Sequence, residues 1–582
     1  MTQEGAGRGF PAGAGSRTSR VIRAVRMMAL LAVLLGSFSG FQLNLEKYYS
    51  NEEVVQFLKD AAKEFPNFVR IEGIGKSVQG RDMWAATVTN FQTGDAARKP
   101  ALYIDGNIHG NEVQGTEVAL YTMWYLLSRY RADPFAKKML DEHTFYIVPV
   151  VNLDGRAVFL GGGTTADPDS PRHNMRPVDD DGDGLVDEDG PEDLDGDGMI
   201  TQMRIKDPYG PFKTNKDDPR SLTFRNADEK GEYRVYDEGI DNDGDGDFNE
   251  DPVGGFDMNR NYPYGWRPGM SDYGGFYPLS EPETRATALF ILKHPNIAAV
   301  MSYHNNGNMI LRAPTSQTDT GIPQSDIQVY DILGNAGKIY LPDYRYLQTF
   351  TGLYPAYGTT VDYGYFGAGV ISFTNELFQI PTEHPEQWWA AAAAELKWTD
   401  KMYHGAGWVD WHPFHHPQLG DVDIGGWAKL SRRTPPAEFL HELTLPNTLF
   451  TLNIVDNFPR VHIRNVKVTE LDDTHFRVEA DAVNDGAMAT NTALAVQKGV
   501  AHPDWIEIRP GSDSSRIEVF AAGEEDITNG EIEKPEKRAR VRFDRIAGGQ
   551  RRRVAWIIRG QGKVQINLNS EKGYFDTASA DL

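Results

Sequence analysis

The most constraining feature of this sequence is an alternation of two short apolar runs with a long apolar segment between them. Residues 101–105 form a short apolar run that ends at a glycine, residues 112–130 form a long and mostly apolar segment, and residues 145–151 form a second short run. Short apolar runs bounded by turn residues are typical of buried strands, and a long one is typical of a buried helix. The order predicts an α/β domain with a mixed, largely parallel central sheet flanked by helices.

A chain of 582 residues is too long for one ordinary core. After residue 446 the texture changes to short alternating or β-branched segments separated by turn residues, which predicts a C-terminal β-sandwich over residues 447–582. The Pro- and Gly-rich segment 408–446 is interpreted as a linker. Further elements predicted for the α/β domain are helices over residues 46–64 and 386–402 and strands over residues 69–74, 83–89, 298–303 and 369–374.

The first forty residues have the order of a secretory signal peptide. Four arginines precede the apolar run 27–35, and small residues follow it. The run is far shorter than the roughly 20 residues of a membrane span. We therefore predict a signal peptide over residues 1–40, a catalytic domain over residues 41–407 and no stable membrane span, with an uncleaved anchor as the alternative. The absence of cysteine excludes disulfides and thiol chemistry, and with the signal peptide it favours a secreted or periplasmic protein of a bacterial envelope.

The net charge of −24 is concentrated in one region. Residues 179–197 hold 11 acidic and no basic residues, and residues 237–251 hold 8 acidic and no basic residues. Local acidic clusters more often bind a hard cation than a charged partner. The distribution disfavours nucleic acid binding, and it marks residues 177–256 as an acidic insertion within the catalytic domain.

Three side chains of the predicted α/β domain could bind one cation. His109 and Glu112 lie on the turn between the first predicted strand and the long helix, and His304 ends a later apolar strand. Zinc accepts two His and one Glu and keeps a fourth position for water. Glu376 ends another apolar strand, where a carboxylate is unfavourable without a cation or a proton. Taken alone, His-x-x-Glu is a weak signal, and a helix-capping Glu with a surface His is the alternative.

These residues and several motifs in the same order resemble the zinc metallocarboxypeptidase superfamily (carboxypeptidase A/B-like) over residues 44–405. Phe256-Asp-Met-Asn-Arg-Asn-Tyr262 is similar to its Asp-x-Asn-Arg-Asn motif, and Pro278-Leu-Ser-Glu-Pro-Glu-Thr284 is similar to its following loop. Tyr354 precedes Glu376 by 22 residues, the family's spacing between its mobile tyrosine and its catalytic glutamate. The resemblance implies a carboxypeptidase-like fold.

The resemblance also implies a complete catalytic site. Zinc would be bound by His109, Glu112 and His304, and a zinc-bound water would attack the peptide bond. The other implied roles are Glu376 as general base, Arg176 as the group that polarises the scissile carbonyl, Tyr354 closing over the terminal residue, Asn259 and Arg260 binding the free carboxylate, Val361 at the base of the specificity pocket, and Asp257 orienting His109.

The implied function is a secreted zinc carboxypeptidase that hydrolyses the C-terminal bonds of peptides or proteins. Val361 favours an apolar or aromatic terminal side chain, and Asn111 and Asn305 depart from the family in ways that affect subsites. One alternative is a family endopeptidase that acts on cell-wall peptides, which would be expected to lack the Arg260 clamp. Another is a non-catalytic, calcium-organised binding protein, which would be expected to lose Glu376 or a zinc ligand. The sequence indicates no oligomeric state.

Three short repeats in the acidic insertion resemble the start of a calcium-binding loop. Each has Asp at its first, third and fifth positions followed by Gly, but none has the Glu that ends an EF-hand loop. A solvated acidic loop is the alternative interpretation. The predicted calcium ligands are Asp179, Asp181, Asp183, Asp193, Asp195, Asp197, Asp241, Asp243 and Asp245.

Overall fold

The computed structural model describes most of the chain after residue 40. The predicted signal peptide, Asp181 and the first residues of the helix predicted over 386–402 lie outside the described residues. No helix in the described part is long and apolar enough to cross a bilayer. The described residues are 41–162, 165–166, 171–180, 182–269, 273–381, 392–511, 516–526 and 528–582.

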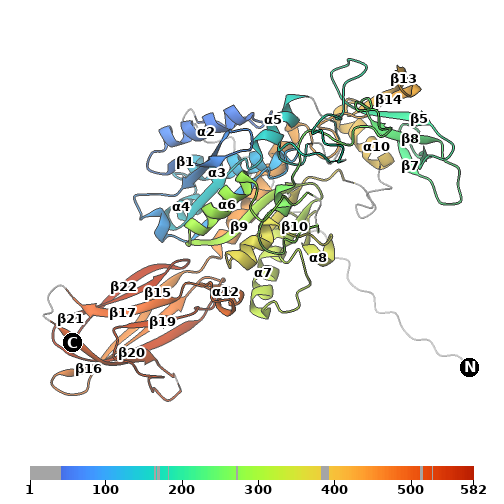
Figure 1. Ribbon diagram of the computed structural model, residues 1–582. Coiled ribbons are helices and arrows are strands. Elements are labelled where there is room, and N and C mark those ends of the chain that lie inside the picture. The colour runs from blue at the N-terminus through green and yellow to red at the C-terminus, as the bar shows by residue number, and fades with distance from the viewer. Residues whose placement is uncertain are drawn as a thin grey trace, which may run out of the picture. The chain divides into compact units, whose positions relative to one another are not determined.

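A mixed sheet forms the centre of the α/β domain (Figure 1). Its four central strands, β4, β3, β9 and β12, run parallel to one another. Strands β1 and β2 pair antiparallel at one side, and β10 pairs antiparallel with β12 at the other. The predicted fold class is therefore confirmed. In spatial order the described strands are β1 (Val69–Lys76), β2 (Asp82–Val88), β4 (Thr144–Val148), β3 (Ala101–Gly106), β9 (Ile297–Asn305), β12 (Ile371–Leu377), β10 (Met309–Arg312) and β11 (Arg345–Gln348).

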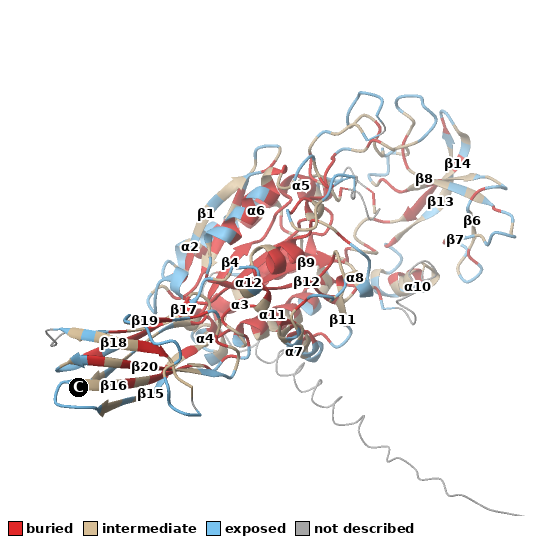
Figure 2. Cartoon of the chain, turned by 60° about the horizontal axis from the view of Figure 1, so that its bottom comes forward, coloured by how far each residue is buried: buried red, intermediate tan, exposed pale blue. Residues whose placement is uncertain are grey.

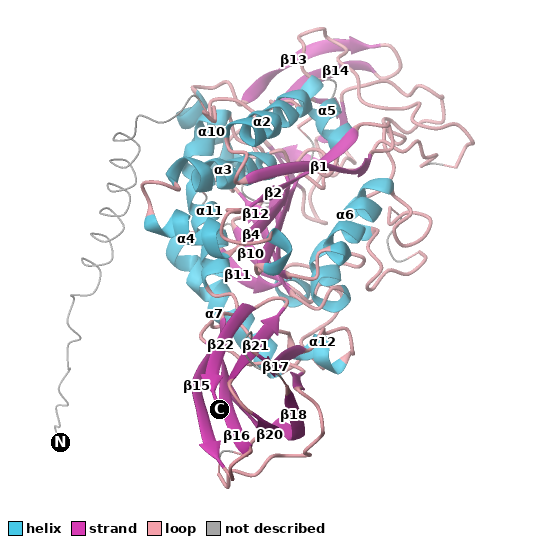
Figure 3. Cartoon of the chain, turned by 90° about the vertical axis from the view of Figure 1, so that its left-hand side faces the viewer, coloured by secondary structure: helices cyan, strands magenta, loops and turns pink. Residues whose placement is uncertain are grey.

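Helices cover both faces of this sheet, with α3 and α11 on one face and α6 on the other (Figure 3). Strands β3, β4 and β9 are buried along their whole length because of this cover, and Figure 2 shows the buried residues gathered there. The helices are α2 (Asn51–Glu64), α3 (Gln114–Arg129), α4 (Pro134–Glu142), α5 (Leu153–Gly161), α6 (Pro282–Lys293), α7 (Gln324–Tyr340), α8 (Thr349–Gly352), α9 (Thr360–Asp362), α10 (Ala392–Tyr403) and α11 (Leu440–Asp456).

The acidic insertion contributes strands to a second sheet, which the sequence analysis did not predict. Two later strands, β13 and β14, complete this sheet, and Met203, Val422 and Ile424 form its small core. The six described strands, in spatial order, are β13 (Trp408–His416), β14 (Gly420–Trp427), β5 (Gln202–Lys206), β8 (Tyr233–Asp237), β6 (Phe212–Thr214) and β7 (Leu222–Phe224).

The segment 408–446, interpreted as a linker from its composition, instead contains β13, β14 and the start of α11. Strand β13 lies at the edge of its sheet, where Pro413 is tolerated because no second neighbour needs its missing N–H. Helix α11 packs on α3, with the hydroxyl oxygens of Thr122 and Thr448 2.8 Å apart. Residues up to the end of α11 therefore pack with the α/β domain.

The residues after α11 form two packed antiparallel sheets, as the predicted β-sandwich requires. Trp556, Val478 and Ile566 belong to one buried core that both sheets share. The short helix α12 (Ala493–Gln497) docks on α7, where Asp326 accepts hydrogen bonds from the backbone N–H groups at the start of α12. The described strands are β15 (Val461–Glu470), β16 (His475–Asn484), β20 (Arg551–Gly560) and β18 (Ile517–Glu524) in one sheet, and β19 (Arg540–Phe543), β17 (Asp504–Pro510), β21 (Lys563–Ser570) and β22 (Tyr574–Asp581) in the other.

Candidate active site

The turn between β3 and α3 brings two of the predicted zinc ligands next to the third. His109 and Glu112 lie on this turn, and His304 lies near the end of β9, the parallel neighbour of β3. The turn is tight because Gly106 and Gly115 face each other: a Cβ on Gly106 would lie 2.6 Å from the backbone of Gly115. The carboxyl ends of parallel strands are where α/β proteins place their sites.

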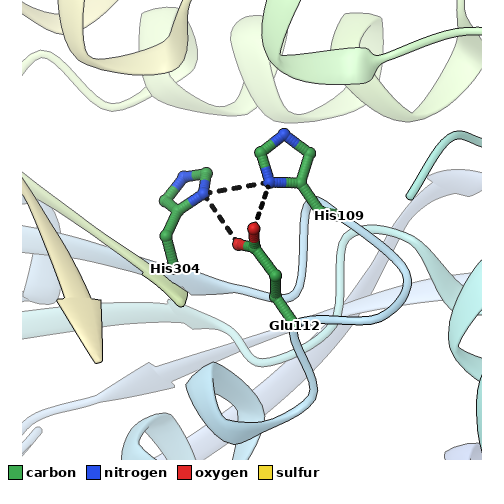
Figure 4. Close-up of side chains that lie close together, drawn as sticks. All are labelled: His109, Glu112 and His304. Carbon is green, nitrogen blue, oxygen red and sulfur yellow. Dashed lines mark hydrogen bonds and ion pairs between the residues drawn. The ribbon is translucent and has the colours of Figure 1, made fainter. Parts of the chain in front are cut away.

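His109, Glu112 and His304, here called the His–Glu–His cluster, point toward one common centre (Figure 4). Nδ1 of His109 lies 2.9 Å from Oε1 of Glu112, Nδ1 of His304 lies 3.0 Å from Oε2 of Glu112, and the two Nδ1 atoms are 3.2 Å apart. Tetrahedral zinc with ligand distances of about 2.0 Å separates its ligand atoms by about 3.3 Å. The donor set and its spacing therefore fit a zinc ion.

The electrostatics of the cluster also suit a cation. All three residues are at most 2% exposed. Burial alone would raise the pKa of Glu112, but the charges of His109 and His304 hold that pKa well below its usual range. Glu112 is therefore ionised and presents a carboxylate to the centre of the cluster.

Two residues hold His109 from behind. Nε2 of His109 lies 3.1 Å from Oδ1 of Asp257 and 2.8 Å from Nη2 of Arg172. Arg172 also donates from Nε to Oδ2 of Asp257 at 3.0 Å and from Nη1 to Oε1 of Glu112 at 3.4 Å. Burial would raise the pKa of Asp257, but Arg172 and His109 hold it well below its usual range. The structure thus brings Asp257, as predicted, and Arg172, which was not predicted, to the cluster.

A second buried pair lies behind His304. Oγ of Ser302 is 3.3 Å from Nε2 of His304 and donates to Oδ1 of Asp105 at 2.5 Å. Asp105 and Ser302 are register partners on β3 and β9 and are fully buried. Burial raises the pKa of Asp105 to about 6. No motif in the sequence indicated this pair, although Ser302 stands two residues before His304 and so shares its face of the strand.

Glu376 faces the cluster from the next strand. It is the register partner of His304 in the parallel pair β12–β9, so both side chains lie on the same face of the sheet. Burial and the neighbouring carboxylate of Glu112 raise the pKa of Glu376 to about 7. A carboxyl with a pKa near neutrality can both accept and return a proton at physiological pH.

The residues predicted to contact the C-terminal residue of the substrate gather around η2 (Met258–Arg260). The guanidinium of Arg260 lies 6.0 Å from the ring centre of Tyr354, which is 46% exposed. Oδ1 of Asn259 accepts a hydrogen bond of 2.8 Å from the backbone N–H of Thr360, and the adjacent Val361 is buried. These four predicted residues therefore lie together next to Asp257.

Arg176 does not join the His–Glu–His cluster. Its Nε donates to Oε2 of the buried Glu281 at 2.8 Å, and the same oxygen accepts from Nδ2 of Asn174 at 2.7 Å. Arg176 thus compensates a buried carboxylate at the start of α6, while Arg172, four residues earlier, contacts the cluster. Spacing along an irregular segment could not distinguish the two arginines.

The profile of the zinc carboxypeptidase family matches residues 54–175 and 224–393, together half of the chain. The chain belongs to this family. A second profile, a domain of unknown function (DUF8731), matches residues 460–581, which form the β-sandwich.

Relatives of this chain include animal carboxypeptidases. Carboxypeptidase A6 of Homo sapiens is 26% identical over 353 residues, which cover 59% of this chain and 62% of the human protein. Carboxypeptidase M of Mus musculus is 33% identical over 109 residues, which cover 19% of this chain and 25% of the mouse protein. The chain thus spans less than two thirds of the length of these relatives. The crystal structure of carboxypeptidase A from Helicoverpa armigera matches 65% of this chain and 80% of its own chain, with 19% identity and a TM-score of 0.40.

One arginine of the site region lies outside the matched stretches. Arg433 follows β14 and donates from Nε to Oδ1 of Asn306 at 3.1 Å and from Nη2 to the backbone oxygen of Asn305 at 3.2 Å. Its positive charge lowers the pKa of Glu376, although burial and Glu112 keep that pKa raised. Together with Asn111 and Asn305, Arg433 lines a pocket beside the cluster. No motif in the sequence pointed to this residue.

The predicted calcium ligands lie apart from the His–Glu–His cluster. Carboxylate oxygens of Asp193, Asp195 and Asp197 lie within 4.8 Å of one another. Both oxygens of Asp179 accept backbone N–H groups of its own loop. Asp181 lies outside the described residues. The remaining predicted ligands group with acids that were not predicted: Asp183 and Asp243 with Glu188, Asp241 and Asp243 with Asp189, and Asp243 and Asp245 with Glu250.

Proposed function

We propose that this protein is a zinc-dependent carboxypeptidase that removes single residues from the C-terminal ends of peptides or proteins. The observation that carries the proposal is the convergence of three buried donors with tetrahedral spacing, next to a carboxyl whose pKa burial raises to about 7. Family membership supports the same reading.

His109, Glu112 and His304 would hold the zinc. When bound, zinc supplies a Lewis acid that makes a water nucleophilic near neutral pH. Glu376 accepts a proton from the attacking water and returns it to the nitrogen of the leaving residue. Its place beside His304 on the same face of the sheet supports this role.

We assign the polarisation of the scissile carbonyl to Arg172 instead of Arg176. Arg172 contacts Glu112, and Asp257 fixes its guanidinium. A fixed cation beside the reacting carbonyl stabilises the negative charge that develops on the oxygen. Burial alone would lower the pKa of Arg172. The carboxylates of Asp257 and Glu112 outweigh this effect and raise the pKa above its usual value, so the side chain stays charged.

The free carboxylate of the substrate would be bound by Arg260 and Asn259. A guanidinium matches a carboxylate with two parallel hydrogen bonds. Tyr354 lies over Arg260 and is exposed enough to move across a bound terminal residue. Buried Val361 beside Asn259 favours an apolar or aromatic terminal side chain.

The test uses blocked dipeptides with a free C-terminus and their C-terminally amidated counterparts, with and without a zinc chelator. We expect chelator-sensitive cleavage of the free-carboxylate peptides only. Equal cleavage of both forms would replace the proposal with an endopeptidase, and no cleavage of either would favour a binding protein.

A pair of variants sharpens this test. Arg260→Gln should raise KM for the free-carboxylate peptides, whereas Arg267→Gln, an exposed arginine seven residues away, should not. Equal KM values for the two variants would remove Arg260 from the carboxylate site.

The signal peptide predicted over residues 1–40 supports export to a bacterial envelope or medium, and the N-terminal sequence of the mature protein tests this.

We extend the proposal to the acidic insertion, whose Asp-rich repeats we infer to bind calcium.

A further inference from the structure

Two of the acidic repeats are copies of one another. Residues 179–189 and 241–251 both read Asp-x-Asp-Gly-Asp-Gly and both end in Glu-Asp. The described parts of the two repeats share a hydrogen-bond pattern, because Asp179 and Asp241 each accept the N–H groups of the glycines three and five residues later. We call these two segments the paired repeats.

The paired repeats meet and interleave their carboxylates. A β-bridge joins Asp189 to Asp251 at their ends. Carboxylate oxygens of Asp183 and Glu188 in the first repeat lie within 4.8 Å of Asp243 in the second. Carboxylate oxygens of Asp189 in the first repeat and of Asp241 and Asp243 in the second also lie within 4.8 Å of one another. Each of these two clusters therefore draws ligands from both repeats, whereas the cluster of Asp243, Asp245 and Glu250 lies within the second repeat.

Several of these oxygens are buried without a partner. Asp189 and Asp251 are fully buried, yet Oδ2 of Asp189 and both oxygens of Asp251 accept no hydrogen bond. Both oxygens of Glu188 and of Glu250 are likewise unpartnered. Burying a carboxylate that no donor or cation compensates is strongly unfavourable. The oxygens therefore point to a ligand of positive charge.

The clustered charges repel one another in the absence of such a ligand. Carboxylate oxygens of Asp243, Asp245 and Glu250 lie within 4.8 Å of one another, as do those of Asp183, Glu188 and Asp243. Hard divalent cations bind carboxylate oxygens, and calcium accepts six to eight of them in flexible geometry, whereas magnesium keeps several waters. An oxygen-rich, loop-built cluster suits calcium.

The paired repeats lie directly next to the segments that reach the His–Glu–His cluster. Arg172 lies seven residues before the first repeat, and Asp257 lies six residues after the second. Between them, the backbone N–H of Asn174 donates to the oxygen of Phe256 at 2.9 Å, and the N–H of Gly255 donates to the oxygen of Asn174 at 3.0 Å. The segment between Arg172 and the first repeat is thus hydrogen-bonded to the segment between the second repeat and Asp257.

We propose that the paired repeats form one shared calcium site, built from Asp183, Glu188, Asp189, Asp241, Asp243, Asp245, Glu250 and Asp251, and that calcium bound there fixes the positions of Arg172 and Asp257. Calcium joins the ends of the two repeats, so the segments that carry Arg172 and Asp257 are held in register. The effect on catalysis rests on the proposed peptidase function, whereas calcium binding does not.

In the binding test, calcium chloride is titrated into the zinc-loaded, full-length protein in calcium-free buffer. The heat of binding and the midpoint of thermal unfolding are measured. We expect calcium to bind and to raise the midpoint more than magnesium does. Glu250→Gln should weaken calcium binding at least tenfold with unchanged zinc content, while Asp228→Asn, an exposed acid of the same insertion, should bind as the unaltered protein does. Equal calcium affinity of Glu250→Gln and Asp228→Asn would overturn the shared site. If Glu250→Gln fails to fold, the unaltered protein provides the test. A thermal midpoint of unfolding that does not change when calcium is added would overturn the shared calcium site.

The catalytic test compares kcat/KM with and without calcium on a free-carboxylate dipeptide. We expect a loss of at least tenfold without calcium, with zinc still bound. An unchanged kcat/KM in a protein that binds calcium would overturn the link to Arg172 and Asp257. A protein that binds calcium but cleaves no peptide in either condition would refute the peptidase proposal while supporting the calcium site.

Discussion

The His–Glu–His cluster and the paired repeats both bring together side chains that can bind a metal ion, yet these side chains are held in opposite ways. In the His–Glu–His cluster each histidine is fixed from behind, His109 by Asp257 and His304 by Ser302. Its residues also stand at the ends of strands buried on both faces. In the paired repeats the acids stand on loops, and their buried oxygens lack partners.

This difference separates a preorganised site from one that its ligand organises. Side chains fixed by a second layer of hydrogen bonds keep their geometry whether or not the metal is bound. Unpaired carboxylates on loops reach a defined geometry only when a cation neutralises them. We therefore expect substitutions at the first cluster to change chemistry with little change in fold, and loss of cation at the second to loosen the segments around it.

The largest effect is expected from substitution of Glu376, the proposed general base. Glu376→Gln removes the proton acceptor without removing a zinc ligand, so kcat should fall by about 10²–10⁴. Zinc content and calcium binding should be unchanged, as metal analysis and calorimetry can check. A parallel loss of zinc would mean that the cluster is less preorganised than its hydrogen bonds indicate.

The second prediction separates the two arginines of the segment 171–180. Arg172→Gln should lower kcat/KM by about 10²–10³, the loss typical of one donor to a developing oxyanion. Arg176→Gln should lower kcat/KM far less and should mainly lower the thermal midpoint, because it leaves the buried Glu281 partly uncompensated. The reverse ranking of kcat/KM would restore the assignment to Arg176.

The third prediction tests the support behind His304. Asp105→Asn weakens the hydrogen bond that fixes Ser302, and zinc affinity should fall by about 10–100-fold. Competition with a chromogenic chelator measures this affinity. Glu283→Gln is the matched control, since it alters another buried acid that accepts a backbone N–H of Val78 instead of contacting the cluster. Equal zinc affinity in both variants would show that Asp105 only stabilises the fold.

The smallest effect concerns pH. Glu376 acts as a base when deprotonated, so kcat/KM rises with pH through its pKa. The charge of Arg433 lowers that pKa. Arg433→Gln should therefore move the rising limb of the kcat/KM–pH profile to higher pH by a fraction of a pH unit. Arg432→Gln removes a guanidinium that pairs with Glu395 and should leave the limb in place. Identical pH profiles of the two variants would show that Arg433 does not act on Glu376.

Much of the fold was predictable because the sequence pattern is strong where burial is complete. The apolar runs at 101–105 and 298–303 match β3 and β9, and the segment 112–130 matches α3. The insertion strands and the hairpin after residue 407 were missed. Their strands are short or half-exposed, and β13 carries a proline that only an edge position tolerates.

The sequence by itself determined the donor types and their order: two histidines, two glutamates and the Asp-x-Asn-Arg-Asn motif, each at a strand end or tight turn. Local pattern suffices there because burial and periodicity fix where a strand ends. Only the tertiary structure decided that Arg172 and not Arg176 contacts the cluster, and that Asp105 supports His304. It also decided that the repeats at 179–189 and 241–251 meet. Such contacts join segments far apart in the chain or lying on irregular loops, where no periodicity sets the direction of a side chain.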